Sequence, residues 1–335
     1  MLKESQRYCG VHTPFKGVRV YNVGVMGLPG VEAALEELTC LVLGDLVKEG
    51  RVCKLADDLF IGESSVEEAM ETFKLVLHKF KENNLKLNPS KTIIAPGSVS
   101  FLGWTWCAGR LKASSHKLSA LASCPPPPTV AALKSFIGAF RFISRVIKGY
   151  ASLLAPLEDA VRGKDKGEKI EWSEQLMSAF TKAKQSINHS KAITIPRPSD
   201  KLSIVTDASV RPGAIGATLY VIRNKPELAG FFNCKLPEYQ RRWLPCELEA
   251  LAIAAALIHF APFIIQSSQR PQVLTDSKPC VDAANKLARG AFSSSARLST
   301  FLSAASRYNA VVSHIPGSLN LLSDHASRNP LQCVQ

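Results

Sequence analysis

Short apolar runs and longer apolar stretches alternate with polar segments along this chain of 335 residues. The runs at 202–206 and 273–275 are short and β-branched, which favours buried strands, and GAIGATL at 213–219 is expected to form a further strand. The Ala- and Leu-rich run at 250–257 favours a buried helix instead. The pattern predicts a mixed α/β, or α+β, fold.

The first hundred residues show a second alternation of strand and helix patterns. Residues 16–22 alternate as a strand does, and a helix is expected over 31–47. Two short apolar flanks around Asp57 and Asp58 describe a hairpin with both acids at its tip. A helix through about residue 82 follows, and four apolar side chains are expected to be its core stripe: Met70, Phe73, Leu77 and Phe80.

Four consecutive prolines at 125–128 separate these elements from the rest of the chain. Proline lacks the amide hydrogen and has a fixed backbone angle, so this stretch continues neither helix nor sheet and forms a stiff spacer. Helices are predicted on its far side at 130–145 and around 174–187.

Charge and cysteine content narrow the class of protein. Lys and Arg total 41 against 28 Asp and Glu, which gives a net charge of +13 and suits a polyanionic partner, although basicity alone also suits a membrane surface. The nine cysteines form no C-x-x-C pair, so we expect reduced, mostly buried thiols in an intracellular protein. The N-terminus lacks the apolar core of a signal peptide, and the longest apolar stretch is short for a membrane span.

Four carboxylates occur where a strand or helix would deliver an acid to a common centre: Asp207, Glu249, Asp276 and Asp324. Magnesium prefers hard oxygen ligands, and two ions about 3.5–4 Å apart can activate water and stabilise a leaving oxygen. For any one acid, an isolated position at a strand end, a helix cap or the solvated surface is an equally good interpretation, but the four together argue against it. Glu247 is a rival for the helix acid, on a different face from Glu249.

This quartet, with the strand at 213–219, resembles the ribonuclease H domain of retroelement polyproteins. CELEALAIAAALIHFAPFI at 246–264 is similar to that family's catalytic helix, and VLTDSKP at 273–279 to its third-acid strand. The resemblance implies a five-stranded mixed sheet with flanking helices and favours Glu249 over Glu247. His314, ten residues before Asp324, matches a mobile histidine that would assist protonation or product release; its alternative is a partly buried loop histidine.

The upstream motifs resemble the palm of reverse transcriptases from long-terminal-repeat retroelements. KLADDLFIG carries the acid pair Asp57 and Asp58, which the family uses as polymerase metal ligands, and Lys91 matches the lysine after the palm helix. FLGW at 101–104 is similar to the primer-side hairpin. The resemblance also implies a segment beside template and incoming nucleotide, formed by Met26, Gly27, Pro29 and Gly30.

Two departures from the palm pattern bear on polymerase activity. The position two before the acid pair holds Leu55 where the family has an aromatic residue. The family also needs an upstream aspartate and fingers, for which some fifty residues leave no room, so we expect the polymerase half to be inactive as given and the chain to be part of a longer polyprotein. The expected division is a partial palm at 1–120, a thumb and connection at 121–195, the ribonuclease H domain at 196–330 and a tail at 331–335.

The predicted activity is metal-dependent endonucleolytic cleavage of RNA in RNA–DNA hybrids, with two Mg²⁺ or Mn²⁺ ions held by the quartet. The expected partners are hybrid and template–primer nucleic acid, together with other parts of a parent polyprotein such as its integrase or protease, and no membrane. The expected location is the cytoplasm, in a virus-like particle, or the nucleus. Two alternatives stay open: a catalytically silent nucleic-acid-binding relic, including a host-encoded one, and a full RNA-directed DNA polymerase if an upstream segment is supplied.

Overall fold

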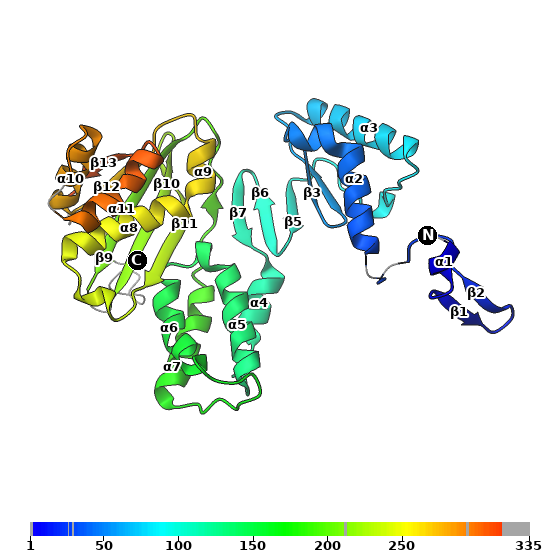
Figure 1. Cartoon of the computed structure of the whole chain (residues 1–335), viewed down its shortest axis with the longest axis horizontal. Helices are drawn as coiled ribbons and strands as arrows, with labels where there is room; N and C mark the ends of the chain where they lie inside the picture. The colour runs from blue at the N-terminus through cyan, green and yellow to red at the C-terminus, as the bar shows by residue number, and fades with distance from the viewer. Residues whose placement is uncertain (1–2, 26, 29, 211–212, 293–294, 317–335) are drawn as a thin grey trace. The chain divides into compact units, whose positions relative to one another are not determined.

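The computed structural model describes residues 3–25, 27–28, 30–210, 213–292 and 295–316, which divide between two compact units. The first unit runs over residues 1–96 and the second over residues 97–335 (Figure 1). No helix in the described ranges combines the length and hydrophobicity that a membrane span requires.

The first unit contains the hairpin and the long helix that the sequence pattern predicts. Its small core joins α2, β3 and α3 through the buried side chains of Leu43, Val52, Val76 and Phe80. The Ser65 side chain accepts from the Glu68 amide and so caps α3. The elements are α1 (Lys3–Gln6), β1 (Gly10–Thr13), β2 (Gly17–Val20), α2 (Val31–Lys48), β3 (Val52–Leu55), β4 (Asp58–Ile61), α3 (Val66–Glu82) and a 3₁₀ turn η1 (Pro89–Lys91).

The expected core stripe of α3 is partly wrong. Phe80 is buried, but Leu77 is 43% exposed, and the buried face instead includes Thr72 and Val76. A 3.6-residue period identifies an apolar side of a helix, but the contacts with α2 and β4 decide which neighbouring row of side chains is covered.

The second unit begins with a small antiparallel sheet and a helical cluster. The predicted apolar face is buried, with Phe136 and Phe140 of α5 (Val130–Phe142) and Ile143 directly after it between 0 and 4% exposed. The proline stretch is packed against this cluster, since the Trp172 ring nitrogen donates to the Pro127 carbonyl at 3.1 Å. The elements are β5 (Ser98–Phe101), β6 (Trp104–Cys107), β7 (Arg110–Ala113), α4 (Ser115–Ser123), α5 (Val130–Phe142), η2 (Ser144–Val146), α6 (Tyr150–Val161), α7 (Glu174–Ile187) and β8 (Ile193–Thr194).

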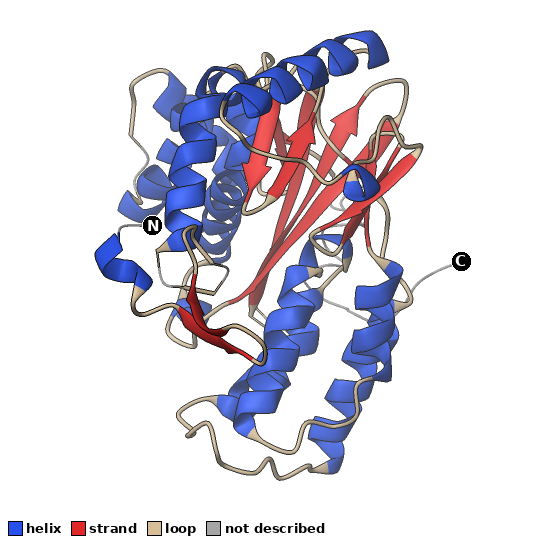
Figure 2. Ribbon diagram, turned by 90° about the vertical axis from the view of Figure 1, so that its right-hand side faces the viewer, coloured by secondary structure: helices blue, strands red, loops and turns tan. Residues whose placement is uncertain are grey.

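A five-stranded mixed sheet with flanking helices forms the remainder of the described second unit and confirms the predicted architecture. Its strand order is β11-β10-β9-β12-β13: the first three strands are antiparallel, and β12 and β13 run parallel to β9. The strands twist relative to one another (Figure 2). The elements are β9 (Lys201–Ser209), β10 (Ala214–Ile222), β11 (Pro226–Lys235), η3 (Gln240–Arg242), α8 (Pro245–His259), α9 (Ala261–Gln266), β12 (Gln272–Thr275), α10 (Lys278–Ala288), α11 (Ala296–Arg307) and β13 (Val311–His314).

Helix α8 is apolar on nearly all sides because it contacts β9 and β10 as well as α11 (Figure 1). Leu248, Ala252, Ile253 and Leu257 are all fully buried. A helix that is hydrophobic around its circumference belongs in an interior. The sheet and this helix therefore hold each other in a fixed relative position.

The expectation of mostly buried cysteines is wrong for the part of the chain described. Eight cysteines are described, all of them as free thiols, and only Cys280 among them is buried. The others lie on exposed or half-exposed faces, where a small side chain is tolerated without contributing to a core.

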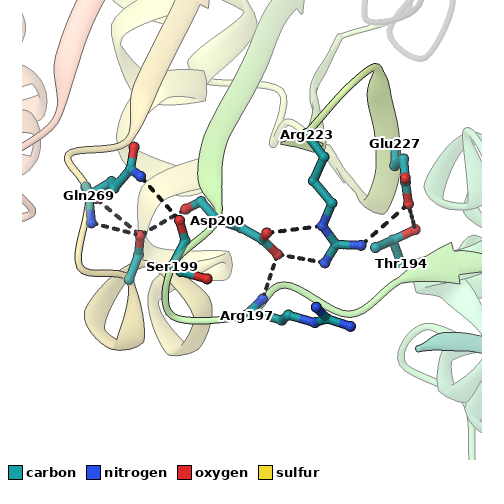
Figure 3. A network of polar contacts seen from close by, with 8 residues as sticks. Thr194, Arg197, Ser199, Asp200, Arg223, Glu227 and Gln269 are labelled. Carbon is teal, nitrogen blue, oxygen red and sulfur yellow. Dashed lines mark hydrogen bonds and ion pairs between the residues drawn. The ribbon is translucent and has the colours of Figure 1, made fainter. Parts of the chain in front are cut away.

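A polar network connects β8 to the end of the five-stranded sheet where β9 begins (Figure 3). Arg223 donates to both carboxylate oxygens of Asp200, at 3.0 and 2.7 Å, and the Arg197 amide donates to Asp200 at 2.7 Å. Thr194 of β8 donates to Glu227 of β11 at 2.7 Å. Bidentate Arg–carboxylate contacts are geometrically specific, so this network fixes the segment between β8 and β9 against the five-stranded sheet.

The network should make stability depend on pH. Hydrogen bonds from Arg223 hold the pKa of Asp200 below its usual value, despite the opposing effect of burial. A lowered folded-state pKa stabilises the fold above the unfolded pKa of about 4, and this stabilisation is lost as the pH falls through the folded value. Urea unfolding of wild type and Asp200→Asn, at pH values from about 6 to 3, measures the effect. The difference between their free energies of unfolding should shrink as the pH falls. A difference that stays constant across this range would contradict the role of Asp200.

Candidate metal centre

Three of the four predicted carboxylates meet at one end of the five-stranded sheet. Asp207, Glu249 and Asp276 each offer an oxygen atom, and these atoms lie within 4.8 Å of one another. Asp207 is 1% exposed and Glu249 8%, while Asp276 is half-buried. Among the described residues they form the one cluster of three or more His, Cys, Asp or Glu side chains that could share a metal ion.

The strand register explains how two of the acids come together. In the parallel pair of β12 and β9, Leu274 lies opposite Val205. Asp276 and Asp207 each lie two residues further along, so they emerge at the same end of neighbouring strands. Side chains two residues apart share a face of a strand, which keeps both acids in line with the paired residues before them.

Glu249 reaches this centre from α8, in the helix's second turn. Its Oε1 atom accepts a hydrogen bond from the backbone amide of Ala208, at 3.0 Å. Because Ala208 follows Asp207 directly, this bond holds the helix acid against the strand acid. No side-chain pattern in the sequence indicates this hydrogen bond, because its donor is a backbone amide.

The electrostatics of the cluster favour a bound cation. Three ionised carboxylates this close together repel one another, and burial of two of them removes solvent screening. A divalent cation with a preference for oxygen ligands would offset both costs, and the donor set fits Mg²⁺ or Mn²⁺ rather than a soft metal. The residues present therefore suit a hard divalent ion.

The two glutamates of α8 differ in their contacts. Glu247 points away from the acids and accepts from Ser295 Oγ, Arg297 Nη1 and the Leu244 amide, at distances of 3.1 to 3.2 Å. Burial tends to raise the pKa of Glu247, but these hydrogen bonds outweigh it and leave the pKa below its usual value. Glu249, not Glu247, joins the carboxylate cluster.

The remaining residues predicted for the nuclease site have different outcomes. His314 is exposed at the end of β13, where it lies opposite Thr275, the residue before Asp276. It is therefore at the same end of the sheet as the carboxylates. Asp324 lies outside the described residues, so its place in the centre stays a prediction.

The residues predicted for a polymerase site lie in the first unit. Asp57 is in the turn between β3 and β4, Asp58 begins β4, and both side chains are exposed, as is Lys91 in η1. Gly27 and Gly30 have positive φ angles of 88° and 83°, and Gly30 is the residue before α2. Met26 and Pro29 lie outside the described residues. The structure places the acid pair at a hairpin tip, as predicted, but does not test its role.

Comparison with known families identifies the domain around the carboxylate cluster. Residues 172–271 match the family model described as the RNase H-like domain found in reverse transcriptase. This segment includes β9 to β11 and α8, and thus Asp207 and Glu249. The fold and the match together define an RNase H-like domain of the reverse-transcriptase type.

The relatives of the chain extend this result to nearly its whole length. It is 27% identical over 308 residues to the retrovirus-related Pol polyprotein from transposon opus of Drosophila melanogaster, covering 88% of this chain and 30% of the relative. It is 24% identical to the transposon Tf2-3 polyprotein of Schizosaccharomyces pombe, covering 93% and 23%, and 25% identical to the Pol polyprotein from transposon gypsy of Drosophila melanogaster, covering 88% and 28%. Over nearly its whole length the chain is thus similar to transposon Pol polyproteins, as its motifs predicted, and it spans less than a third of each relative.

Solved structures share the fold of this chain. A foamy viral protease-reverse transcriptase in complex with double-stranded DNA matches with a TM-score of 0.73 and 17% identity, covering 94% of this chain and 64% of that one. The same viral protein in complex with an RNA/DNA hybrid matches with a TM-score of 0.70 and 16% identity, covering 100% and 44%. At these identities the similarity establishes the fold.

Proposed function

We propose that this chain hydrolyses the RNA strand of RNA–DNA hybrids at the carboxylate cluster. The observation that carries the proposal is the convergence of Asp207, Glu249 and Asp276 within 4.8 Å, on three separate elements of an RNase H-like fold. Mixed-sheet domains serve many functions, so the site and not the fold supports the chemistry.

Asp207, Glu249 and Asp276 would hold divalent ions, joined by Asp324. Two such ions, when bound, would generate a nucleophilic hydroxide and stabilise the charge that develops on the phosphate. The rigid elements hold the acids in place: the Ala208 amide orients Glu249, and the paired strands orient the two aspartates. His314, exposed at the same end of the sheet, would donate a proton to the leaving oxygen.

An RNA–DNA hybrid is the proposed substrate for two reasons. A foamy viral protease-reverse transcriptase with the same fold was solved in complex with such a hybrid. The surplus of positive charge, +13 over the chain, suits a polyanionic duplex. Recognition should rest on duplex shape and 2′-hydroxyl groups, with little sequence preference.

Asp57 and Asp58 have a separate proposed role. Their exposed position at a hairpin tip suits an acid pair that joins other ligands in a polymerase metal site. We propose that they act in this way as two of the ligands of such a site.

The test of the nuclease uses strand-labelled RNA–DNA hybrid, duplex RNA and duplex DNA with the wild-type chain in Mg²⁺ and in chelator. We expect the wild-type chain to cut the RNA strand of the hybrid in Mg²⁺ but not in chelator, and to cut neither duplex RNA nor duplex DNA. Asp276→Asn should cut none of the three substrates. Equal cleavage of duplex DNA, or full activity in the variant, would refute the proposal. Salt-sensitive binding of the hybrid without any metal-dependent cleavage would instead favour the silent nucleic-acid-binding protein.

A further inference from the structure

The first turn of α8 is tied to α11 by a cluster of polar and aromatic contacts on the side away from the carboxylates. Glu247 is 7% exposed, and its carboxylate accepts from Ser295 Oγ at 3.2 Å and from Arg297 Nη1 at 3.1 Å. It also accepts from the Leu244 amide at 3.2 Å, at the residue that precedes the helix. One buried carboxylate thus joins the start of α8 to the start of α11.

Arg297 is itself held by an aromatic stack. Its guanidinium lies 4.7 Å from the centroid of the Trp243 ring, and Trp243 is stacked on Phe301 with centroids 5.9 Å apart and an interplanar angle of 26°. Trp243 lies two residues before α8, and Phe301 is in α11. The cation–π contact and the salt bridge therefore hold one side chain between two elements.

These contacts act on the first turn of α8, directly before the turn that presents Glu249. Glu247 and Glu249 are two residues apart, so at 100° per residue their side chains leave α8 about 200° apart. Glu247 faces α11, and Glu249 faces β9, where it accepts from Ala208. A rotation or shift of this turn would move Glu249 relative to Asp207 and Asp276, which are fixed by the strands.

We propose that Arg297 is a positioning residue for the carboxylate centre, acting through Glu247 and Trp243 to hold Glu249 against β9. This inference rests on the proposed function only in taking the carboxylates as ligands of a divalent ion. Arg297 touches none of the three acids in the described contacts, and its side chain is 53% exposed.

The sign of the effect on metal binding distinguishes positioning from simple electrostatics. Arg297 carries a positive charge near a site for cations, so by Coulomb's law alone its removal would strengthen binding of Mn²⁺. If Arg297 positions Glu249, its removal weakens binding of Mn²⁺, because one ligand is no longer held in place. Loss of an outer-shell partner typically weakens metal affinity 10- to 100-fold, and we expect about tenfold here.

The experiment compares wild type, Arg297→Met and Arg307→Met by calorimetric titration with Mn²⁺, in the absence of nucleic acid. Arg307 ends the same helix and is exposed, so its variant removes equal charge without touching Glu247. Thermal unfolding of each variant, measured beforehand, sets a temperature at which all three are folded. About tenfold weaker binding in Arg297→Met, with Arg307→Met like wild type, is the expected result.

Other outcomes separate the competing roles. Unchanged or tighter Mn²⁺ binding in Arg297→Met would overturn the positioning role, even if the variant melts at a lower temperature. If Arg297→Met binds hybrid more weakly in chelator but keeps its Mn²⁺ affinity, Arg297 is a phosphate contact. That result would also overturn the positioning role. Because the titration needs no substrate, a wild type that binds Mn²⁺ but cuts no hybrid would refute the nuclease proposal separately.

Discussion

Replacing Asp207 with asparagine is expected to reduce cleavage of an RNA–DNA hybrid by more than about a hundredfold at saturating Mg²⁺. Asp207 is the most buried of the three clustered acids, and an amide cannot replace a carboxylate as a charged ligand. Losing an outer-shell partner of a metal site costs about 10- to 100-fold, so loss of a ligand should exceed that range. Initial rates on labelled hybrid, under matched substrate concentrations, measure the effect.

The same substitution should have the opposite effect on stability without metal. Removing one of three like charges relieves repulsion within the cluster, so the melting temperature of Asp207→Asn in chelator should rise relative to wild type. Asp282→Asn is the matched control, because Asp282 is exposed on α10, outside the cluster.

The cleavage rate decides the catalytic role of the cluster. If Asp207→Asn cleaves the hybrid within a few-fold of the wild-type rate, the cluster is not the catalytic centre.

Replacing Phe180 with alanine is expected to cost about 3–5 kcal/mol in the free energy of unfolding of the helical cluster. Phe180 of α7 is 2% exposed, and its ring contacts those of Phe136 and Trp172, with centroids 4.8 and 5.3 Å apart. The substitution leaves a cavity where three aromatic rings meet, which neighbouring helices held by their own contacts cannot readily fill.

Urea unfolding followed by tryptophan fluorescence and circular dichroism measures this loss. Phe292→Ala makes the same chemical change at a side chain that is 81% exposed, and it should change stability by less than about 0.5 kcal/mol. A loss below about 1 kcal/mol for Phe180→Ala would mean that the helical cluster is not packed as described.

The sequence predicted the elements whose apolar pattern is long or regular. The helices α2, α5 and α7 were expected at nearly their observed bounds, and short apolar runs predicted strands β9, β10 and β12. The five-stranded sheet as a whole was implied by the family resemblance. The convergence of Asp207, Glu249 and Asp276 was predictable because strand ends and one buried helix leave few places for the acids to point. The family resemblance supplied the order of these elements.

The contacts that hold the site could not be predicted in the same way. Arg297 lies fifty residues after Glu247, and neither residue belongs to a pattern that indicates the other. The Ala208 amide that orients Glu249 is a backbone group and leaves no mark in the sequence. The exposed Leu77 shows a similar limit, because periodicity cannot say which side of a helix its neighbours cover.

The most direct test of the metal centre is a crystal of this chain soaked in Mn²⁺, with diffraction data collected at the manganese absorption edge. The expected result is an anomalous peak within about 2.0–2.5 Å of carboxylate oxygens from Asp207, Glu249 and Asp276, absent or weaker in Asp207→Asn crystals. Manganese bound elsewhere, with no peak among these three side chains, would contradict the assignment of the cluster as a metal centre.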